Sequence, residues 1–385
     1  MKKLFYCLIL LMAAGCKQRY DSPVKSPVTG YLVVDGVVNS GPDSTTITLS
    51  RTTKFDNKNI VYETGAAVNV QGTDSSVHPL RETTKGVYMA GNMHLDNTLK
   101  YRLRINTADG RRYASDFAIV KNNPPIDSIS WKLENGGLQL YINTHDALNN
   151  TQYYQWYYDE TWEIHSSYTS SLKYKIVASP SGNIYSVIFR DSVNHSFDPN
   201  IIKCWQFNKP YNIFISSTAK LSQDIVYLPL QFIPQASIKL GVLYSMHVKQ
   251  YSWTKDGYEF LDRMRKNTET TGSIFDPQPS ELNGNIHNIA DATEPVIGYF
   301  NICPVQEMRI YIKSTDVPGW GYATYCTDIV IENISDSIKM KGSGLLPTEV
   351  VEYGPFGSIL TFNAATPECV DCTLRGSNKK PSFWP

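Results

Sequence analysis

The sequence has no excess charge of either sign: 36 Lys and Arg residues balance 36 Asp and Glu residues over 385 positions. Proteins that bind nucleic acid usually present a basic face, because they neutralise phosphates. The balance therefore argues against nucleic acid as a partner. Beyond its first residues the chain also lacks any apolar run near the roughly 20 residues of a membrane-spanning helix. We expect a chain that does not thread through a membrane.

Common catalytic signatures are missing as well. There is no Gly-x-Ser-x-Gly elbow, no His-Glu-x-x-His pair and no glycine loop for phosphate, and the seven histidines lack metal-ligand spacing. Glu160 and Glu163 could form a glycosidase pair, but on a strand they would point to opposite faces. We predict no catalytic residue, no metal and no cofactor, and hence no enzyme. Carboxylates distant in sequence could still meet in space.

The first sixteen residues, MKKLFYCLILLMAAGC, are typical of a lipoprotein signal. Two lysines precede a short apolar run, and small residues precede Cys16. We expect a signal peptide over 1–15, acylation of Cys16 and a lipidated tether over 16–26. Each buried acyl CH₂ contributes roughly 0.8 kcal/mol, and lasting anchorage needs more than one chain. An ordinary signal peptide is the alternative, because lipoprotein signals usually carry Leu three residues before the cysteine and this chain has Ala13 there.

Period-2 alternation dominates the rest of the chain and predicts a mostly β fold. Alternating segments separated by turn residues predict an Ig-like β-sandwich over 27–121. The run KNNPPIDS, 121–128, breaks the pattern because proline cannot continue a ladder. A second, larger β domain is expected over 126–385, with one amphipathic helix near 255–267. Asp256 could cap that helix, which would pack across a sheet or present its apolar stripe to a partner.

An aromatic segment, TQYYQWYYDETWEIHSSY, covers 151–168. The even positions are mainly apolar and the odd ones mainly polar, which favours a strand with one core face. A platform for a sugar or another flat ligand is the alternative. Tyr153 and Tyr157, on the polar face, are the better candidates to contact a ligand.

Five cysteines remain once the signal is removed and Cys16 is acylated: Cys204, Cys303, Cys326, Cys369 and Cys372. Exported thiols tend to pair, and a zinc site would normally show two close cysteine pairs where this chain has one. We therefore expect disulfides, with Cys369 and Cys372 both oxidised. At least one of them should reach back to Cys204 or Cys326, and Phe383 and Trp384 could then dock on the second domain.

Several stretches resemble one family. They are KCWQFNKPYNIFISSTAKLSQD at 203–224, the run from 244 to 300 that includes DPQPS, GNI and PVIGYF, and the closing CVDCTLRGSNKKPSFW. Together they resemble the domain-of-unknown-function 4249 lipoproteins of Bacteroidota. The resemblance implies an outer-membrane lipoprotein, often encoded beside TonB-dependent transporters. It implies no reaction and no ligand. Cys303 does not belong to the pattern and is the candidate for the unpaired thiol.

The stretch SIFDPQPSELNGNIHN, 273–288, is a candidate partner-facing loop, because loops on rigid scaffolds often carry function. Phe275, Asp276, Gln278 and Ile286 are its candidate contact residues. A crossover packed on its own sheet is the equal alternative. For the whole chain we expect a non-catalytic lipoprotein, held in the outer membrane by the lipid on Cys16. Its expected role is accessory or ligand-capture partner of a TonB-dependent transporter; a surface adhesin and, third, an extracytoplasmic hydrolase are the alternatives.

Overall fold

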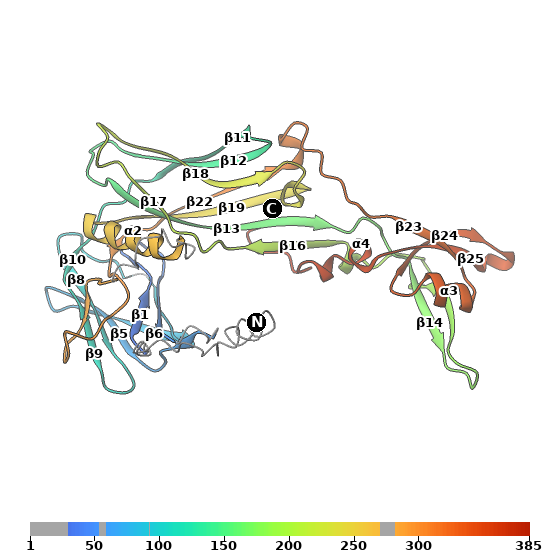
Figure 1. The fold of residues 1–385 in the computed structure, drawn as a ribbon, viewed down its shortest axis with the longest axis horizontal. Helices are drawn as coiled ribbons and strands as arrows, with labels where there is room; N and C mark the ends of the chain where they lie inside the picture. The colour runs from blue at the N-terminus through green and yellow to red at the C-terminus, as the bar shows by residue number, and fades with distance from the viewer. Residues whose placement is uncertain (1–29, 54–58, 92, 270–281) are drawn as a thin grey trace, which may run out of the picture.

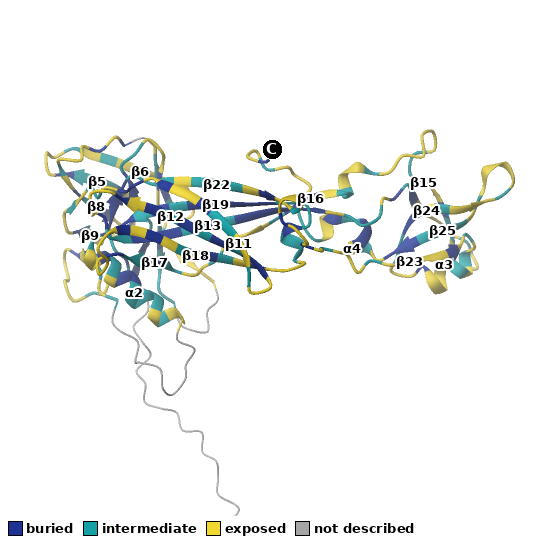
Figure 2. Cartoon of the chain, turned by 90° about the horizontal axis from the view of Figure 1, so that it is seen from above, coloured by how far each residue is buried: buried dark blue, intermediate teal, exposed yellow. Residues whose placement is uncertain are grey.

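The computed structural model describes residues 30–53, 59–91, 93–269 and 282–385, and it confirms a mostly β protein. The molecule is elongated (Figure 1). A sandwich-like body built largely from residues 30–120 occupies one end, two long sheets form the middle, and a small lobe forms the other end. Buried positions follow the long central strands, and exposed ones gather at the ends and loops (Figure 2).

The first body is a ten-stranded sheet that folds over on itself, because β6 pairs with β7 along one half and with β5 along the other. Alternating apolar residues of both halves meet in one core, which includes Leu49, Tyr88 and Ile105. Its strands are β1 (Leu32–Asp35), β3 (Thr45–Arg51), β4 (Val61–Tyr62), β5 (Ala67–Gly72), β6 (Val77–Thr84), β7 (Val87–Ala90), β8 (Lys100–Asn106), β9 (Arg112–Ser115), β10 (Ala118–Ile119) and β20 (Ile286–Asn288).

The chain returns to this first body late in the sequence. Strand β20 pairs with β9, and β21 (Ile302–Cys303) pairs in parallel with β2 (Val38–Asn39). Residues 286–303 follow the predicted domain boundary at 121–128, yet they belong to the first body. They add strands to the sandwich and contribute Phe300 to its core. The predicted domain ranges, 27–121 and 126–385, did not include this return of the chain.

The middle of the molecule is a pair of stacked sheets. One contains β11 (Ile126–Glu134), β12 (Gly137–Asp146) and β18 (Asp224–Pro234); the other contains β16 (Lys203–Asn208), β17 (Phe214–Ser217), β13 (Tyr153–His165), β19 (Leu243–Ser252) and β22 (Gln306–Lys313). The even positions of β13 from Tyr154 to Ile164 are all buried. Its aromatic residues at these positions fill the core between the sheets, and this confirms the expected alternation.

The distal lobe comes from two distant parts of the chain. A hairpin of β14 (Leu172–Val177) and β15 (Ile184–Phe189) packs on a sheet of β23 (Asp328–Glu332), β25 (Ile359–Ala365) and β24 (Leu346–Tyr353). The short helix α3 (Ser335–Lys341) completes it, and Phe362 lies at the centre of its small core. Connecting segments and the short helix α4 (Pro367–Val370) lie between the lobe and the middle sheets (Figure 1).

The predicted helix is α2 (Lys255–Glu269). Its first turn is capped by Thr254, whose hydroxyl accepts from the Gly257 amide at 3.2 Å, so the expectation of an Asp256 cap is wrong. Leu261 is buried with Ile215 and Trp253, which places the apolar stripe of the helix against the sheet. The sequence did not predict α3 and α4.

Candidate functional site

The best candidate for a binding surface is the face of the β16–β13–β19–β22 sheet that points away from the core, called the outer face below. Residues paired across antiparallel strands share a face. Asp159 is opposite His247, which is opposite Arg309, and Tyr157, Lys249 and Glu307 form the next such row. The odd positions of β13 thus lie beside charged residues from two later strands.

These two rows form one charge network. The His247 ring contacts Asp159 at 3.2 Å and Glu307 at 3.0 Å, and Lys249 contacts Glu307 at 2.7 Å. The bonds to the two carboxylates raise the pKa of His247. The bond from His247, helped by Lys249, lowers the pKa of Glu307 to about 2. Opposite charges cancel within the network, so it offers directional donors and acceptors rather than a strong field of one sign.

Two tyrosines lie at the end of the outer face that is beside the first body. Tyr157 packs edge-on against Tyr251 with ring centroids 5.7 Å apart, and the Gln155 amide donates to the Tyr157 hydroxyl at 2.8 Å. Burial raises the pKa of both tyrosines. Asp35, at the end of β1, is exposed to solvent. The protein around its carboxyl nevertheless excludes enough water to raise the pKa of that group. This end of the outer face therefore combines aromatic rings with a carboxylate, and such a combination suits non-covalent binding.

The chain's own C-terminus covers the other end of the outer face. Trp384 is buried between Trp205 and Tyr311, and its indole N–H donates to Glu163 at 2.9 Å. Phe383 stacks on the Arg309 guanidinium at 3.8 Å. This confirms that the aromatic tail docks on the sheet. The part of the outer face left open therefore runs between the tail and the first body.

Two disulfides hold the tail, as expected. Cys204 is bonded to Cys372, 168 positions away, and Cys326 to Cys369, 43 positions away. Cys369 lies in a small apolar cluster at the neck of the distal lobe, while Cys204 belongs to β16. The pair of bridges thus fastens the neck to the outer-face sheet. Among the described cysteines, Cys303 stays outside a disulfide and is buried, as the family pattern suggested.

The predicted contact residues do not gather in one place. Tyr157 lies on the outer face beside Tyr251, but Tyr153 packs on Tyr258 of α2 with centroids 5.2 Å apart. Ile286 is 3% exposed and lies in the core of the first body, so the prediction that it contacts a partner is wrong. It is buried because β20 turns that side chain inward against β9. Phe275, Asp276, Gln278 and Cys16 lie outside the described residues.

Glu160 and Glu163 lie on opposite faces of β13, as expected for two such positions on a strand. Glu160 is buried, accepts from Lys239 and Tyr244, and packs in the core. Glu163 faces the other way and bonds Trp384. In the described part of the chain, no three or more His, Cys, Asp or Glu side chains are grouped to hold a metal ion. No helix within residues 30–53, 59–91, 93–269 or 282–385 is long and apolar enough to cross a bilayer.

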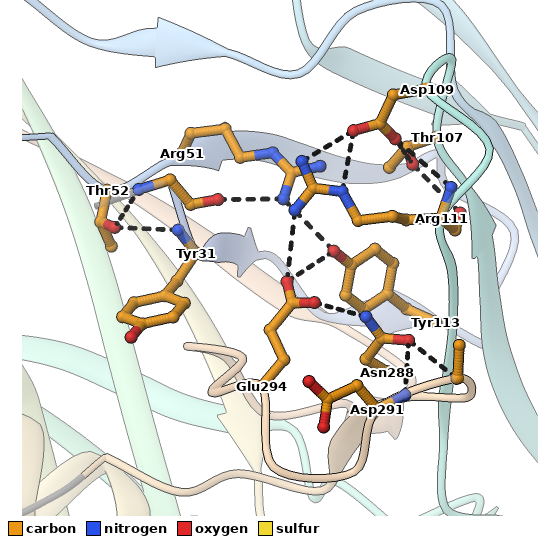
Figure 3. Close-up of polar contacts among 12 residues, drawn as sticks. Tyr31, Arg51, Thr52, Thr107, Asp109, Arg111, Tyr113, Asn288, Asp291 and Glu294 are labelled. Carbon is orange, nitrogen blue, oxygen red and sulfur yellow. Dashed lines mark hydrogen bonds and ion pairs between the residues drawn. The ribbon is translucent and has the colours of Figure 1, made fainter. Parts of the chain in front are cut away.

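A second polar cluster, in the first body, has a structural role (Figure 3). Arg51 of β3 reaches the Tyr113 hydroxyl at 3.3 Å, and that hydroxyl donates to Glu294 at 2.8 Å. Asn288 of β20 donates to the other Glu294 oxygen. Glu63 pairs with Arg51 from the opposite side. These bonds clamp the returning segment to the sandwich, although the buried Nη2 of Arg51 has no hydrogen-bond partner.

Sequence reasoning missed most of the outer face. His247, Glu307 and Asp35 lie in strands far apart in the sequence, and only strand register and the packing of the first body bring them near β13. The alternation within β13 did identify Tyr157. No local motif signals the others.

The comparison with known families agrees with the resemblance. The model of the family described as "Domain of unknown function (DUF4249)" matches residues 17–309. The match ends inside β22, so the sheet of the distal lobe and the cysteine tail follow it. A search of curated proteins finds no match. Because the matched region covers well over half of the 385 residues, the chain belongs to the DUF4249 family.

Proposed function

We propose that the protein is a lipid-anchored lipoprotein of the outer membrane that captures a ligand or docks on a transporter, without catalysing a reaction. The observation that carries this proposal is the combination of an export signal ending at Cys16 with two long-range disulfides in the folded body. Disulfides persist in oxidising compartments outside the cytoplasm. Acylation at Cys16 would then hold the body at a membrane.

The partner in this proposal is a TonB-dependent transporter, because the resemblance implies a lipoprotein of a kind often encoded beside such transporters. The outer face supplies a surface suited to such a role, since its ion pairs and the Tyr157–Tyr251 pair are compatible with reversible, non-covalent contact. A free-standing adhesin would use the same surface. A hydrolase would need a cluster of carboxylates around a substrate.

The anchor is tested with Cys16→Ser. The variant should leave the membrane fraction or accumulate as unprocessed precursor, while the wild-type protein stays with the outer membrane. Normal processing and membrane retention of the variant would contradict the lipid anchor. Labelling with a fatty-acid analogue gives the direct readout.

The partner is tested by purifying the native lipoprotein from mild-detergent extracts and identifying large barrel proteins recovered with it. Lys249→Gln, in the outer face, should reduce recovery of the barrel, and Lys175→Gln, an exposed lysine of the distal hairpin, serves as the matched control. Recovery of the lipoprotein alone would favour the adhesin. Turnover of glycans or peptides, lost on replacing a clustered carboxylate, would favour the hydrolase.

A further inference from the structure

The far end of the distal lobe exposes four large apolar side chains, called the distal tip below. Ile334, Tyr353 and Leu360 are about half exposed (58%, 59% and 47%), and Phe356 is fully exposed. They come from the loop after β23, the end of β24, the β24–β25 turn and the start of β25 (Figure 1). Exposed apolar groups gathered in this way usually indicate an interaction site.

Backbone contacts hold these four positions together. The Asn333 amide donates to the Leu360 carbonyl at 2.7 Å, which joins the end of β23 to β25. The Gly354 amide donates to the Ser358 carbonyl at 2.7 Å and closes the turn that carries Phe356. The backbone of Gly354 also lies directly against the Leu360 side chain. The four positions therefore lie near one another, where three strands end.

Phe356 is displayed at a conformational cost. Its φ is +57°, and Gly357 follows at +74°. A bulky side chain rarely adopts this left-handed region, where glycine or asparagine is usual. The ring is fully exposed, so packing does not compensate for the strain. Strained residues held in place by their surroundings concentrate at functional sites.

The charges near the distal tip are acidic. Glu332 and Glu352 are both paired with Thr361 and so lie on one face of the sheet, on either side of it. Asp336, in the first turn of α3, is a third acidic residue toward the tip, whereas the two lysines of α3, 339 and 341, lie in its last turn. Membrane surfaces with anionic headgroups attract basic segments, and two acidic tips repel each other. The tip thus fits neither an anionic bilayer nor a second copy of itself.

We propose that the distal tip is a docking site for another protein, with Phe356 entering an apolar pocket whose rim is basic. Aromatic side chains that enter partner pockets commonly dominate binding energy, and acidic residues beside them select a rim of opposite charge. The disulfides Cys326–Cys369 and Cys204–Cys372 hold the neck of the lobe to the middle sheets, so the tip is presented on a fastened support. This proposal does not depend on the partner being a transporter.

The test uses the full-length protein in its native cells, with a photoreactive benzoylphenylalanine at position 356. Irradiation should give one discrete adduct with another protein, and the cross-linked peptide should border an apolar pocket lined by Lys or Arg. The same analogue at position 211, where Tyr211 is equally exposed outside the lobe, is the control and should not give this adduct. An adduct with lipid, an adduct with a second copy of the chain, or no adduct above the control would overturn the proposal.

Charge is tested in the same experiment. Glu352→Lys should lower the adduct yield by about fivefold or more, because it reverses the charge beside the tip. Glu349→Lys makes the same change farther back on β24 and should have a much smaller effect. An adduct that is insensitive to Glu352→Lys would contradict the basic rim. With the captured protein purified, Phe356→Gly should weaken binding by about tenfold or more, and unchanged affinity would overturn the docking role of Phe356. If the captured protein is not an outer-membrane barrel, the docking site stands, and the transporter role is decided separately by the recovery experiment with Lys249→Gln.

Discussion

Gly284 lies against the backbone of Gly298 so closely that a Cβ at position 284 would come within 1.7 Å of the Gly298 carbonyl oxygen. The side chain of the next residue, Asn285, makes two hydrogen bonds to the backbone of Phe300. Its Nδ2 donates to the Phe300 carbonyl at 3.0 Å, and its Oδ1 accepts from the Phe300 backbone amide at 2.7 Å. Ile286 then enters the core. The Gly-Asn-Ile and Pro-Val-Ile-Gly-Tyr-Phe runs that carried the family resemblance are therefore two halves of one structural contact.

Gly284→Ala should destabilise the protein by about 2 kcal/mol or more, because backbone atoms on both sides must move apart. The measurement is the free energy of unfolding in denaturant. Gly91→Ala is the control: a Cβ there meets no atom within 4 Å, and we expect a change within about 0.5 kcal/mol. Equal effects at the two positions would show that the close contact at Gly284 is not a constraint.

Removing either disulfide should lower the free energy of unfolding by about 2–5 kcal/mol. The Cys326→Ala, Cys369→Ala pair should chiefly loosen the neck, with faster amide exchange in the distal lobe. The Cys204→Ala, Cys372→Ala pair should instead release the tail from β16 and expose Trp384. Cys303→Ala is the matched control, since it leaves both bridges in place. Non-reducing peptide mapping checks the pairing, and free thiols at both 369 and 372 would refute it.

The sequence predicted what depends on local pattern. Alternation in 153–165 predicted the strand and its buried face, and the apolar stripe around Leu261 predicted the helix. The expectation of an exported protein predicted that the tail cysteines form disulfides. It could not supply what depends on distant register. The return of 286–303 to the first body relies on a backbone approach at Gly284 and Gly298 that no periodicity encodes. The meeting of His247 with Asp159 likewise depends on how β19 pairs with β13.

The outer-face network should make stability depend on pH. The folded-state pKa of His247 is raised above its ordinary value of 6.5, mainly by the bond to Asp159 and then by Glu307. Its stabilising effect is therefore fully present below pH 6.5 and is lost as the pH rises through the folded pKa. His247→Gln should cost on the order of 1 kcal/mol at pH 6, and the difference from wild type should shrink at higher pH. Denaturant unfolding across this range checks it.

Glu307 should act in the opposite direction at low pH. Its pKa is lowered from 4.5 to about 2, first by the bond from His247 and then by Lys249. The stabilisation is present above pH 4.5 and is lost as the pH falls toward 2.

In a variant with Asp159→Asn and Glu307→Gln, the pH dependence assigned to His247 should vanish. A pH profile that is unchanged in this variant would show that the titration arises elsewhere.

Phe356→Gly should stabilise the isolated protein, although it removes a large apolar side chain. In most exposed turns glycine lowers stability, because it adds conformational freedom to the unfolded chain. Here the left-handed φ of +57° costs a non-glycine residue about 1–2 kcal/mol, and the fully exposed ring contributes little packing in return. The sum should be a gain of roughly 1 kcal/mol in the free energy of unfolding. Gly357→Ala, at φ +74° in the same turn, should lose a similar amount. Thermal and denaturant unfolding of both variants provide the measurement. A loss of stability in Phe356→Gly would mean that the ring packs on the protein in solution, and that the distal tip is not held open for a partner.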